Sequence, residues 1–213
     1  MQSAWKKTPG RPPANSQDQS TADRILQVAA DLFMAQGYEK VTVDVVAKEC
    51  QVTKATVYYY YASKASLFTA SVVRLMNEIV TRMKMILSSP KPLRDRLNLI
   101  TQIRLQTGGT QLDFEMVMNE AVPSLTPEQI RAMRDSEELL TSIISEEFAK
   151  EIERGRIRPL PPRLYAHAYV SLLNAFHAKA HGEHRDEWPA TQVAKDLMDF
   201  FWSGADSPLS VVE

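Results

Sequence analysis

Helix-starting and helix-ending residues recur at short intervals along almost the whole chain, and this spacing constrains the fold most. Gly37 follows an apolar helical stripe, Thr126-Pro127-Glu128-Gln129 is a capping box with proline at the first helical position, and Gly155 follows the next long segment. No segment has the pattern of a strand, and seven glycines are few for a turn-dense β-sandwich or barrel. We therefore predict an all-α fold of about nine helices, over about residues 23–36, 43–50, 54–61, 64–87, 93–106, 112–121, 127–154, 162–182 and 190–203.

Composition excludes several classes of protein. The single cysteine, Cys50, leaves no internal disulfide and no multi-cysteine zinc site. No apolar stretch approaches the ~20 residues of a membrane helix, and the N-terminus has no apolar signal-peptide region, so we expect a soluble cytoplasmic protein. Because the formal net charge is −1, binding to nucleic acid would need a local site rather than overall positive charge.

Residues 1–20 are rich in proline and small polar residues and carry Lys6, Lys7 and Arg11. This composition predicts a flexible basic arm, with the first helix capped by Ser20 or Thr21. The arm has two interpretations. It is either a plain tail, or Gly10-Arg11-Pro12 presents an arginine to a narrow minor groove.

Two short predicted helices, 43–50 and 54–61, are joined by a break of three residues. Thr42 and Thr53 are placed to cap their starts, and Val45, Val46 and Cys50 are expected on the inner face of the first. Two short helices around such a break, the second of them polar and exposed, match a helix-turn-helix.

The second of these helices contains four consecutive tyrosines. Val57 and Tyr61 are four residues apart and should share the buried face, which leaves Lys54, Ala55, Thr56, Tyr58, Tyr59 and Tyr60 outside. Four consecutive tyrosines sweep most of the circumference of a helix, so they cannot all face one core. Exposed tyrosines suit DNA, because the hydroxyl can donate to phosphate and the ring can pack on sugar or a thymine methyl group. Lys54 and Lys64 bracket the helix and can pair with phosphates.

Residues 25–68 resemble the N-terminal DNA-binding domain of the TetR/AcrR family of bacterial transcriptional regulators. The resemblance rests on Gly37-Tyr38, Thr42, Val45-Val46-Ala47, Val52-Thr53-Lys54, Thr56-Val57-Tyr58, Tyr60-Tyr61 and Ser63-Lys64. It implies that the residues on or near DNA are Thr42, Val43, Thr53, Lys54, Ala55, Thr56, Tyr58, Tyr59, Tyr60 and Lys64. Ala55 replaces a glycine frequent in the family, and Asp44 stands where some members have a basic contact, so Asp44 is left out of this set.

The resemblance also implies three regions: the arm, residues 1–20; the helix-turn-helix domain, residues 21–68; and an effector-binding and dimerisation domain, residues 69–213. A homodimer would bind a palindromic operator on double-stranded DNA as a repressor, and a small-molecule effector would release it. No cofactor is expected.

The C-terminal half contains methionines and aromatic residues that suit an adaptable apolar pocket or ordinary core packing equally well. The candidate pocket residues are Met76, Met83, Phe114, Met118, Met133, Tyr165 and Asn174. The last two predicted helices would form the dimer interface through Leu164, Tyr169, Leu172, Phe176, Leu197, Phe200 and Phe201.

The motifs and spacings of the chain bear on three other functions. The chain has no GxGxxG, GxxxxGK[ST], GxSxG or HExxH motif, which argues against an enzyme. His177 and His181 are spaced i, i+4 and His184 follows, so a metal-responsive repressor stays open beside the interpretation of a plain helix end. A DNA-binding regulator without an effector is the third alternative.

Overall fold

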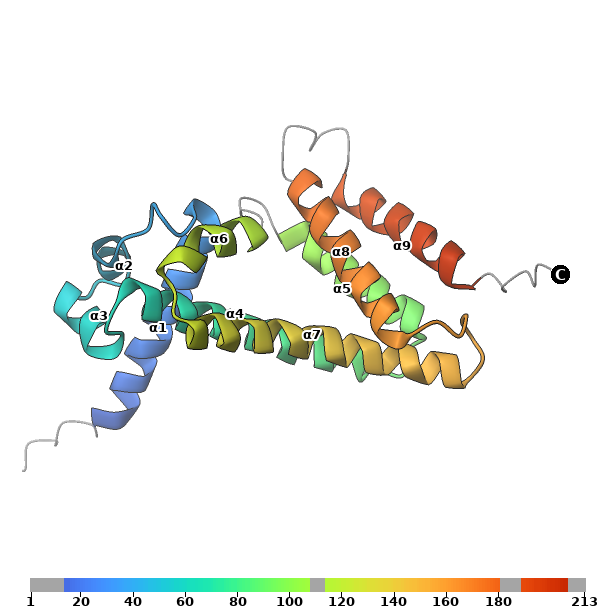
Figure 1. The fold of residues 1–213 in the computed structure, drawn as a ribbon, viewed down its shortest axis with the longest axis horizontal. Helices are drawn as coiled ribbons and strands as arrows, with labels where there is room; N and C mark the ends of the chain where they lie inside the picture. The colour runs from blue at the N-terminus through green and yellow to red at the C-terminus, as the bar shows by residue number, and fades with distance from the viewer. Residues whose placement is uncertain (1–13, 108–113, 181–188, 207–213) are drawn as a thin grey trace, which may run out of the picture.

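The computed structural model describes residues 14–107, 114–180 and 189–206 (Figure 1). This part of the chain contains no strand, as the sequence predicted, and forms nine α-helices and one short 3-10 helix, η1. The elements are α1 (Ala14–Gln36), α2 (Val43–Glu49), α3 (Lys54–Tyr60), α4 (Lys64–Leu87), α5 (Leu93–Thr107), α6 (Phe114–Ala121), η1 (Val122–Ser124), α7 (Pro127–Glu153), α8 (Pro162–Ala180) and α9 (Ala190–Asp206).

The helix ends follow from local chemistry. Ser63 and Thr126 each accept a hydrogen bond from the backbone three residues on, and the side chains of Ser66 and Gln129 reach back to complete capping boxes for α4 and α7. Gly37 ends α1 at φ +88°, a left-handed conformation that glycine adopts without the steric cost of a Cβ atom.

Helices α1 to α3 pack on the first half of α4 and form the N-terminal core. Phe33, Tyr38 and Phe68 meet at its centre, with ring centroids 5.0 to 5.9 Å apart. Buried Val117 of α6 and Met133 of α7 belong to the same core. The N-terminal helices are therefore packed directly onto the C-terminal half.

The C-terminal core is formed by the second half of α4 with α5, α7, α8 and α9. Helices α4 and α7 run side by side along much of the molecule and connect the two cores (Figure 1). Phe148 of α7 stacks on Tyr165 of α8 with centroids 5.0 Å apart, and the buried hydroxyl of Tyr169 donates to the Leu97 carbonyl oxygen at 3.2 Å.

Two sequence-based expectations need correction. Helix α1 begins at Ala14, so residues 14–20, which were expected in a flexible arm, are helical, and Ser20 and Thr21 lie inside the helix rather than at its cap. In α2 the inner residue is Val43, 5% exposed, and not Val45, 39% exposed. Val43, Val46 and Ala47, at spacings of three and four, are the residues that face the core.

Arg11 and the rest of residues 1–13 lie outside the described part of the chain. No helix in the described ranges is long and apolar enough to cross a membrane.

Candidate nucleic-acid interface

Helices α2 and α3 are joined by a tight turn whose ends are capped by threonines. The side chain of Thr42 accepts from the Val45 amide at 3.3 Å, and that of Thr53 accepts from the Thr56 amide at 3.1 Å. Between them Gln51 adopts φ +54°, which lets the Val52 amide bond to the Ala47 carbonyl oxygen at 2.9 Å. The sequence located the break, but a glutamine gives no signal for a left-handed residue.

The inner face of α3 fixes how the helix is rotated. Val57 is fully buried, and the half-buried hydroxyl of Tyr61 donates to the Ala22 carbonyl oxygen of α1 at 3.5 Å. Burial raises the pKa of the Tyr61 hydroxyl, so it remains a donor at neutral pH. Tyr60, expected outside, is half-buried and packs against the N-terminal core, with its ring 5.0 Å from that of Tyr59. Tyr60 therefore supports α3 as well as bordering its outer face.

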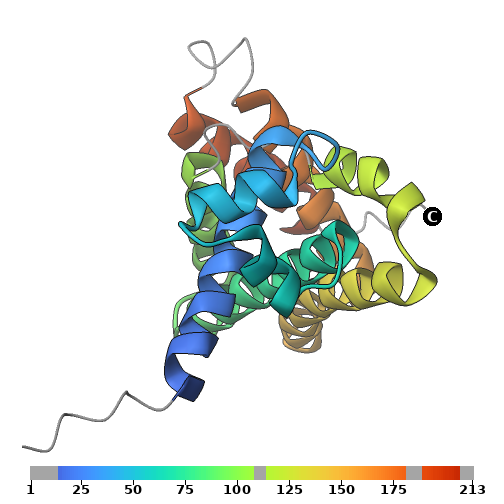
Figure 2. The same ribbon diagram turned by 90° about the vertical axis from the view of Figure 1, so that its left-hand side faces the viewer.

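The outer face of α3 presents Tyr59, which is 78% exposed, and Tyr58, which is 44% exposed. Lys54 and Ala55 are exposed beside them, Thr56 is half-buried, and Thr53 is exposed at the helix start. Figure 2 views the end of the molecule that α2 and α3 form. A helix of seven residues with two exposed aromatic rings, held by a fully buried valine, is suited to contact a groove rather than a protein core.

Asp44 of α2 holds Lys54 of α3 through an ion pair of 2.6 Å between Oδ2 and Nζ. The hydrogen bond that Lys54 donates to the Asp44 carboxylate raises the pKa of Lys54 above its usual value. Both side chains are more than half exposed, so the pair lies on the surface that would face DNA. Lys54 must leave Asp44 before it can bind a phosphate.

Lys64, at the start of α4, has partners within the protein. Its Nζ donates to the Glu39 carbonyl oxygen at 3.2 Å and lies 4.3 Å from the centre of the Tyr38 ring. Thr42 is exposed, but the side chain of Val43 is 5% exposed, so Val43 can offer DNA only its backbone.

Helix α6 contacts the loop between α1 and α2. Glu120 accepts a hydrogen bond from the Glu39 amide at 3.4 Å, and a Cβ atom at Gly37 would lie 2.7 Å from a Glu120 carboxylate oxygen. The positive φ favours glycine at position 37, and a Cβ atom there would also displace the Glu120 carboxylate. The loop is thus held between α6 and the start of α4.

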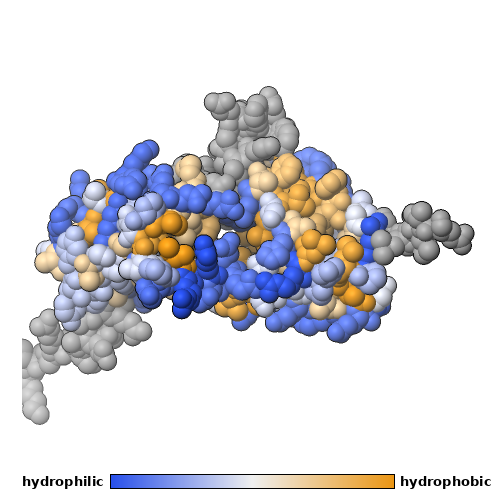
Figure 3. Space-filling view, viewed as in Figure 1, coloured by the Kyte–Doolittle hydropathy of each residue, from blue (hydrophilic) through white to orange (hydrophobic). Residues whose placement is uncertain are grey.

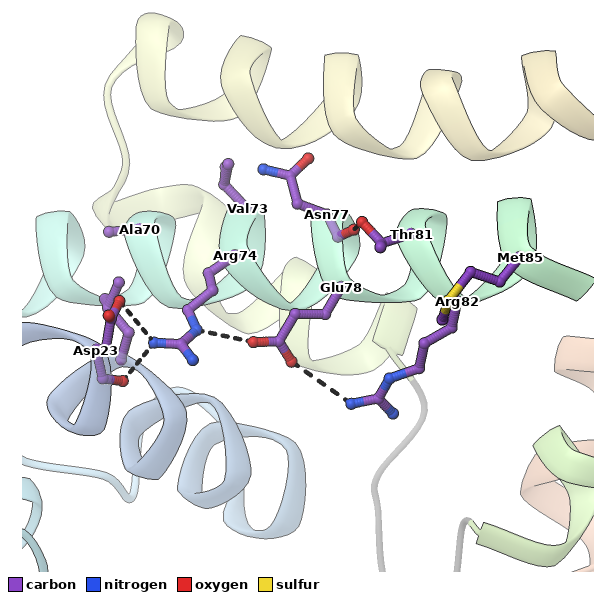
Figure 4. Close-up of a pocket in the computed structure, with 10 residues that line it drawn as sticks. Asp23, Ala70, Val73, Arg74, Asn77, Glu78, Thr81, Arg82 and Met85 are labelled. Atoms are coloured by element: carbon purple, nitrogen blue, oxygen red, sulfur yellow. Dashed lines mark hydrogen bonds and ion pairs between the residues drawn. The ribbon is translucent and has the colours of Figure 1, made fainter. Parts of the chain in front are cut away.

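A second contact joins α1 to α4 in an open groove of about 780 Å³ (Figure 4). Arg74 donates from Nη1 to the Asp23 carboxylate at 3.1 Å and from Nε to Glu78 at 2.9 Å, and Arg82 pairs with the other Glu78 oxygen at 3.7 Å. Arg74 therefore ties the middle of α4 to the part of α1 on which Tyr61 rests.

The candidate effector residues are not brought together. Met76 and Met133 are buried in the N-terminal core, with Phe114 and Met118 packed against it. Met83 and Tyr165 are buried in the C-terminal core, and Asn174 is half-buried on α8. None of the seven lines the groove of Figure 4 or the depression beside Lys84 and Arg96 described below.

The candidate dimer residues divide into two groups. Tyr169, Leu197 and Phe201 are at most 8% exposed and pack inside the C-terminal core. Phe200 is 73% exposed and Leu164 is 53% exposed, while Leu172 and Phe176 are half-buried. Apolar residues gather over the half of the surface that carries α8 and α9 (Figure 3). Only the second group is available to a partner.

The candidate metal site lies outside what the structure describes. His181 and His184 fall in the range 181–188, and the side chain of His177 is also not described. Elsewhere, among the described residues, no group of three or more His, Cys, Asp or Glu side chains is arranged to hold a metal ion. Cys50 is buried at the end of α2, 2% exposed.

The sequence model for bacterial regulatory proteins of the tetR family matches residues 25–70, the segment that contains α2, α3 and the start of α4. An uncharacterized HTH-type transcriptional regulator of Bacillus subtilis (strain 168), YhgD, is 25% identical over 71% of this chain and 79% of its own length. The negative regulator IcaR of the biofilm operon icaADBC of Staphylococcus aureus (strain Newman) is 40% identical over 24% of this chain, which spans 27% of IcaR.

Solved structures share the whole fold at lower identity. The reduced form of NemR from E. coli has a TM-score of 0.74 at 17% identity and covers 89% of this chain and 99% of its own. FadR from Bacillus subtilis, solved in complex with stearoyl-CoA, has a TM-score of 0.71 at 15% identity and covers 85% of this chain and 98% of its own.

Proposed function

We propose that the chain is a transcriptional regulator of the tetR family, to whose N-terminal model residues 25–70 are similar, and that it represses transcription as a homodimer until an effector releases it from DNA. Residues 21–68 would form the DNA-binding domain, and residues 69–213 would form the effector-binding and dimerisation domain. The protein would act on DNA in the cytoplasm. The observation that carries the proposal is the outer face of α3, where Tyr58 and Tyr59 are exposed on a helix fixed by buried Val57.

The proposed contacts separate into three groups. Ala55, Tyr58 and Tyr59 lie on the exposed face of α3 and are assigned to base edges and thymine methyl groups. Thr42, Thr53, Thr56, Lys54 and the backbone of Val43 lie at the starts of α2 and α3, where helix N-termini favour phosphate. Lys64 and Tyr60 are assigned to the edge of the interface, because each also contacts the protein.

The proposed dimer uses exposed apolar side chains of α8 and α9, namely Leu164 and Phe200, with half-buried Leu172 and Phe176 beside them. A twofold axis through this face would present two copies of α3 to one side of DNA. The operator is then expected to be an inverted repeat whose half-sites are one helical turn or more apart.

Repression and release are supported by relatives. IcaR is a negative transcriptional regulator, and FadR was solved with stearoyl-CoA. Within this chain, three residues separate the end of α3 from the start of α4, and Arg74 ties α4 to α1, so a shift of α4 would move the DNA-binding helices. We assign the effector to the C-terminal half and its class to organic, largely apolar molecules.

Selection from a pool of randomised double-stranded DNA tests the proposed function. Enrichment of an inverted repeat, bound by two protomers, is the expected result. Recovery of no enriched sequence, or of unpaired sites bound by single protomers, would contradict it. A thermal-shift screen of small molecules and metal ions against the same protein then identifies the effector class, because a ligand that binds the folded state raises the melting temperature.

A further inference from the structure

A depression rich in basic side chains lies at the end of the molecule opposite α2 and α3 (Figure 1). It is formed where α4 and α7 end and α5 begins, and its volume is about 790 Å³. Six cationic residues line it, against three carboxylates, which leaves an excess of three positive charges. We call this depression the basic basin; its cations are Lys84, Lys91, Arg96, Lys150, Arg154 and Arg156.

Arg96 is the buried member of the basin, with 8% of the residue exposed. Its Nη1 donates to Glu147 Oε2 at 2.6 Å and to the Leu87 carbonyl oxygen. Its Nε is buried and has no hydrogen-bond partner. Because Nε has almost no exposed surface, an anion in the basin would be attracted by the positive charge of the guanidinium group rather than bonded by Nε itself.

Two of the carboxylates are already shared between cations. Glu147 pairs with Arg96 and Lys150, and Glu151 pairs with Arg154 at 2.8 Å and with Arg156 at 3.2 Å. Although burial opposes ionisation of Glu147, its hydrogen bonds from Lys150 and Arg96 bring the net pKa below its usual value, so it stays charged. Each of these glutamates thus neutralises only one of its two basic partners.

Lys84 and Lys91 account for the rest of the excess positive charge in the basic basin. Within the described part of the chain neither forms an ion pair, and the third carboxylate, Glu146, is exposed on α7. Lys84 and Lys150 lie in the last turns of α4 and α7, where cations complement the helix dipole. That effect does not account for Arg96, Lys91 or Arg156, none of which is in the last turn of a helix.

We propose that the basic basin binds the phosphate groups of a small phosphorylated molecule, most favourably a diphosphate. An anion of several charges matches an excess of three positive charges. The arginine guanidinium groups are suited to bidentate contact with phosphate oxygens. The start of α5, at Pro92 and Leu93, adds the positive end of a helix dipole, and the volume lies within the range of small-molecule sites.

Calorimetric titration of the full-length protein with pyrophosphate, without DNA and at constant ionic strength, tests this site. We expect saturable binding of one pyrophosphate per protomer. Lys84→Gln/Lys91→Gln should weaken it about tenfold or more, because two unpaired charges are removed from the exposed rim. Lys195→Gln, an exposed substitution on α9 outside the basin, is the matched control and should change nothing.

Arg96→Lys provides a second variant, with folding checked by circular dichroism, and should also weaken binding. A parallel titration with ADP distinguishes a free diphosphate from one attached to a nucleoside. Stronger binding of ADP would extend the site to the nucleoside, and equal binding would limit it to the diphosphate. No saturable binding at millimolar pyrophosphate, or an equal loss in Lys195→Gln, would overturn the proposal. Because no DNA is present, this result is independent of the proposed repressor function.

Discussion

At the scale of residues, rotation of α3 decides which tyrosines are available to DNA. Val57 and Tyr61 share a face, as their spacing predicted, while Tyr60 turns partly inward because it packs against the N-terminal core. A run of four identical residues contains no pattern that could predict this. How far the N-terminal core extends under α3 is set by α1 and α4. Tyr58 and Tyr59 are therefore the exposed aromatic side chains of α3.

Tyr59→Ala should weaken binding to the selected operator by roughly 1–3 kcal/mol, the size of one lost base contact. Because the side chain is 78% exposed, thermal stability should be almost unchanged. Fluorescence anisotropy with operator and with random DNA measures both affinities. A melting temperature lower by tens of degrees would show that Tyr59 is part of the core, contrary to this account.

Asp44→Asn should raise affinity for random DNA severalfold and reduce the preference for the operator. The substitution frees Lys54 from its 2.6 Å ion pair and removes a negative charge that faces phosphate. Titration with salt should give a steeper dependence of affinity, by up to about one phosphate contact. Glu49→Gln is a matched control, because Glu49 is also exposed on α2 and, within the described part of the chain, forms no ion pair with α3. Weaker binding to random DNA in Asp44→Asn would contradict the role assigned to the pair.

At the scale of elements, side-chain caps made the helices predictable from the sequence. The helices that differ from the prediction do so because their ends or faces depend on packing against distant parts of the chain. Thr42, Thr53, Ser63 and Thr126 act as the N-caps of their helices, and a cap needs only its own few residues. The early start of α1 escaped prediction because polar residues 14–20 have no apolar stripe. Val43 is buried where Val45 was expected, because the seven residues of α2 are too few to fix its rotation from the sequence.

Arg74→Gln should loosen the first half of α1 without unfolding the molecule. The substitution removes the contacts to Asp23 and Glu78, which join α1 to α4. Hydrogen exchange followed by mass spectrometry should show faster exchange in peptides covering residues 20–30, with α5 and α9 unchanged.

Arg82→Gln serves as the control for Arg74→Gln. Arg82 is 73% exposed in its side chain and pairs only with Glu78, at 3.7 Å, within the same helix. Its removal should leave exchange in α1 as in the wild type. Equally accelerated hydrogen exchange of α1 in both variants would mean that the charge on the α4 surface, and not the Arg74 contact to α1, sets the mobility of α1.

At the scale of the whole molecule, the sequence predicted an all-helical chain. It did not indicate whether a given apolar side chain packs in the N-terminal core, in the C-terminal core or against a partner. Periodicity identified Tyr169, Leu197 and Phe201 as apolar and inward-facing; it could not distinguish the protomer's own core, where they lie, from a dimer interface. The methionines show the same limit, because Met76 and Met83, one heptad apart on α4, belong to different cores.

Phe200→Glu should convert the proposed dimer to monomers, because it places a charge on the most exposed aromatic residue of α9. Analytical ultracentrifugation at micromolar concentration measures the change. Met85→Glu is the control, since Met85 is 65% exposed on α4 and away from α8 and α9, and this variant should stay dimeric. A monomeric wild type would remove the basis for the inverted-repeat operator.

Site-directed DNA cleavage tests the central claim most directly, namely that α3 lies in the major groove at two symmetric half-sites. An iron chelate attached to the Tyr59→Cys variant should cut the selected operator at two positions related by its twofold axis. Cys50 is 2% exposed and should not react with the reagent. The same chelate on Lys195→Cys of α9 should not cut. Equal, diffuse cleavage by both conjugates, or cleavage in only one half-site, would contradict the account.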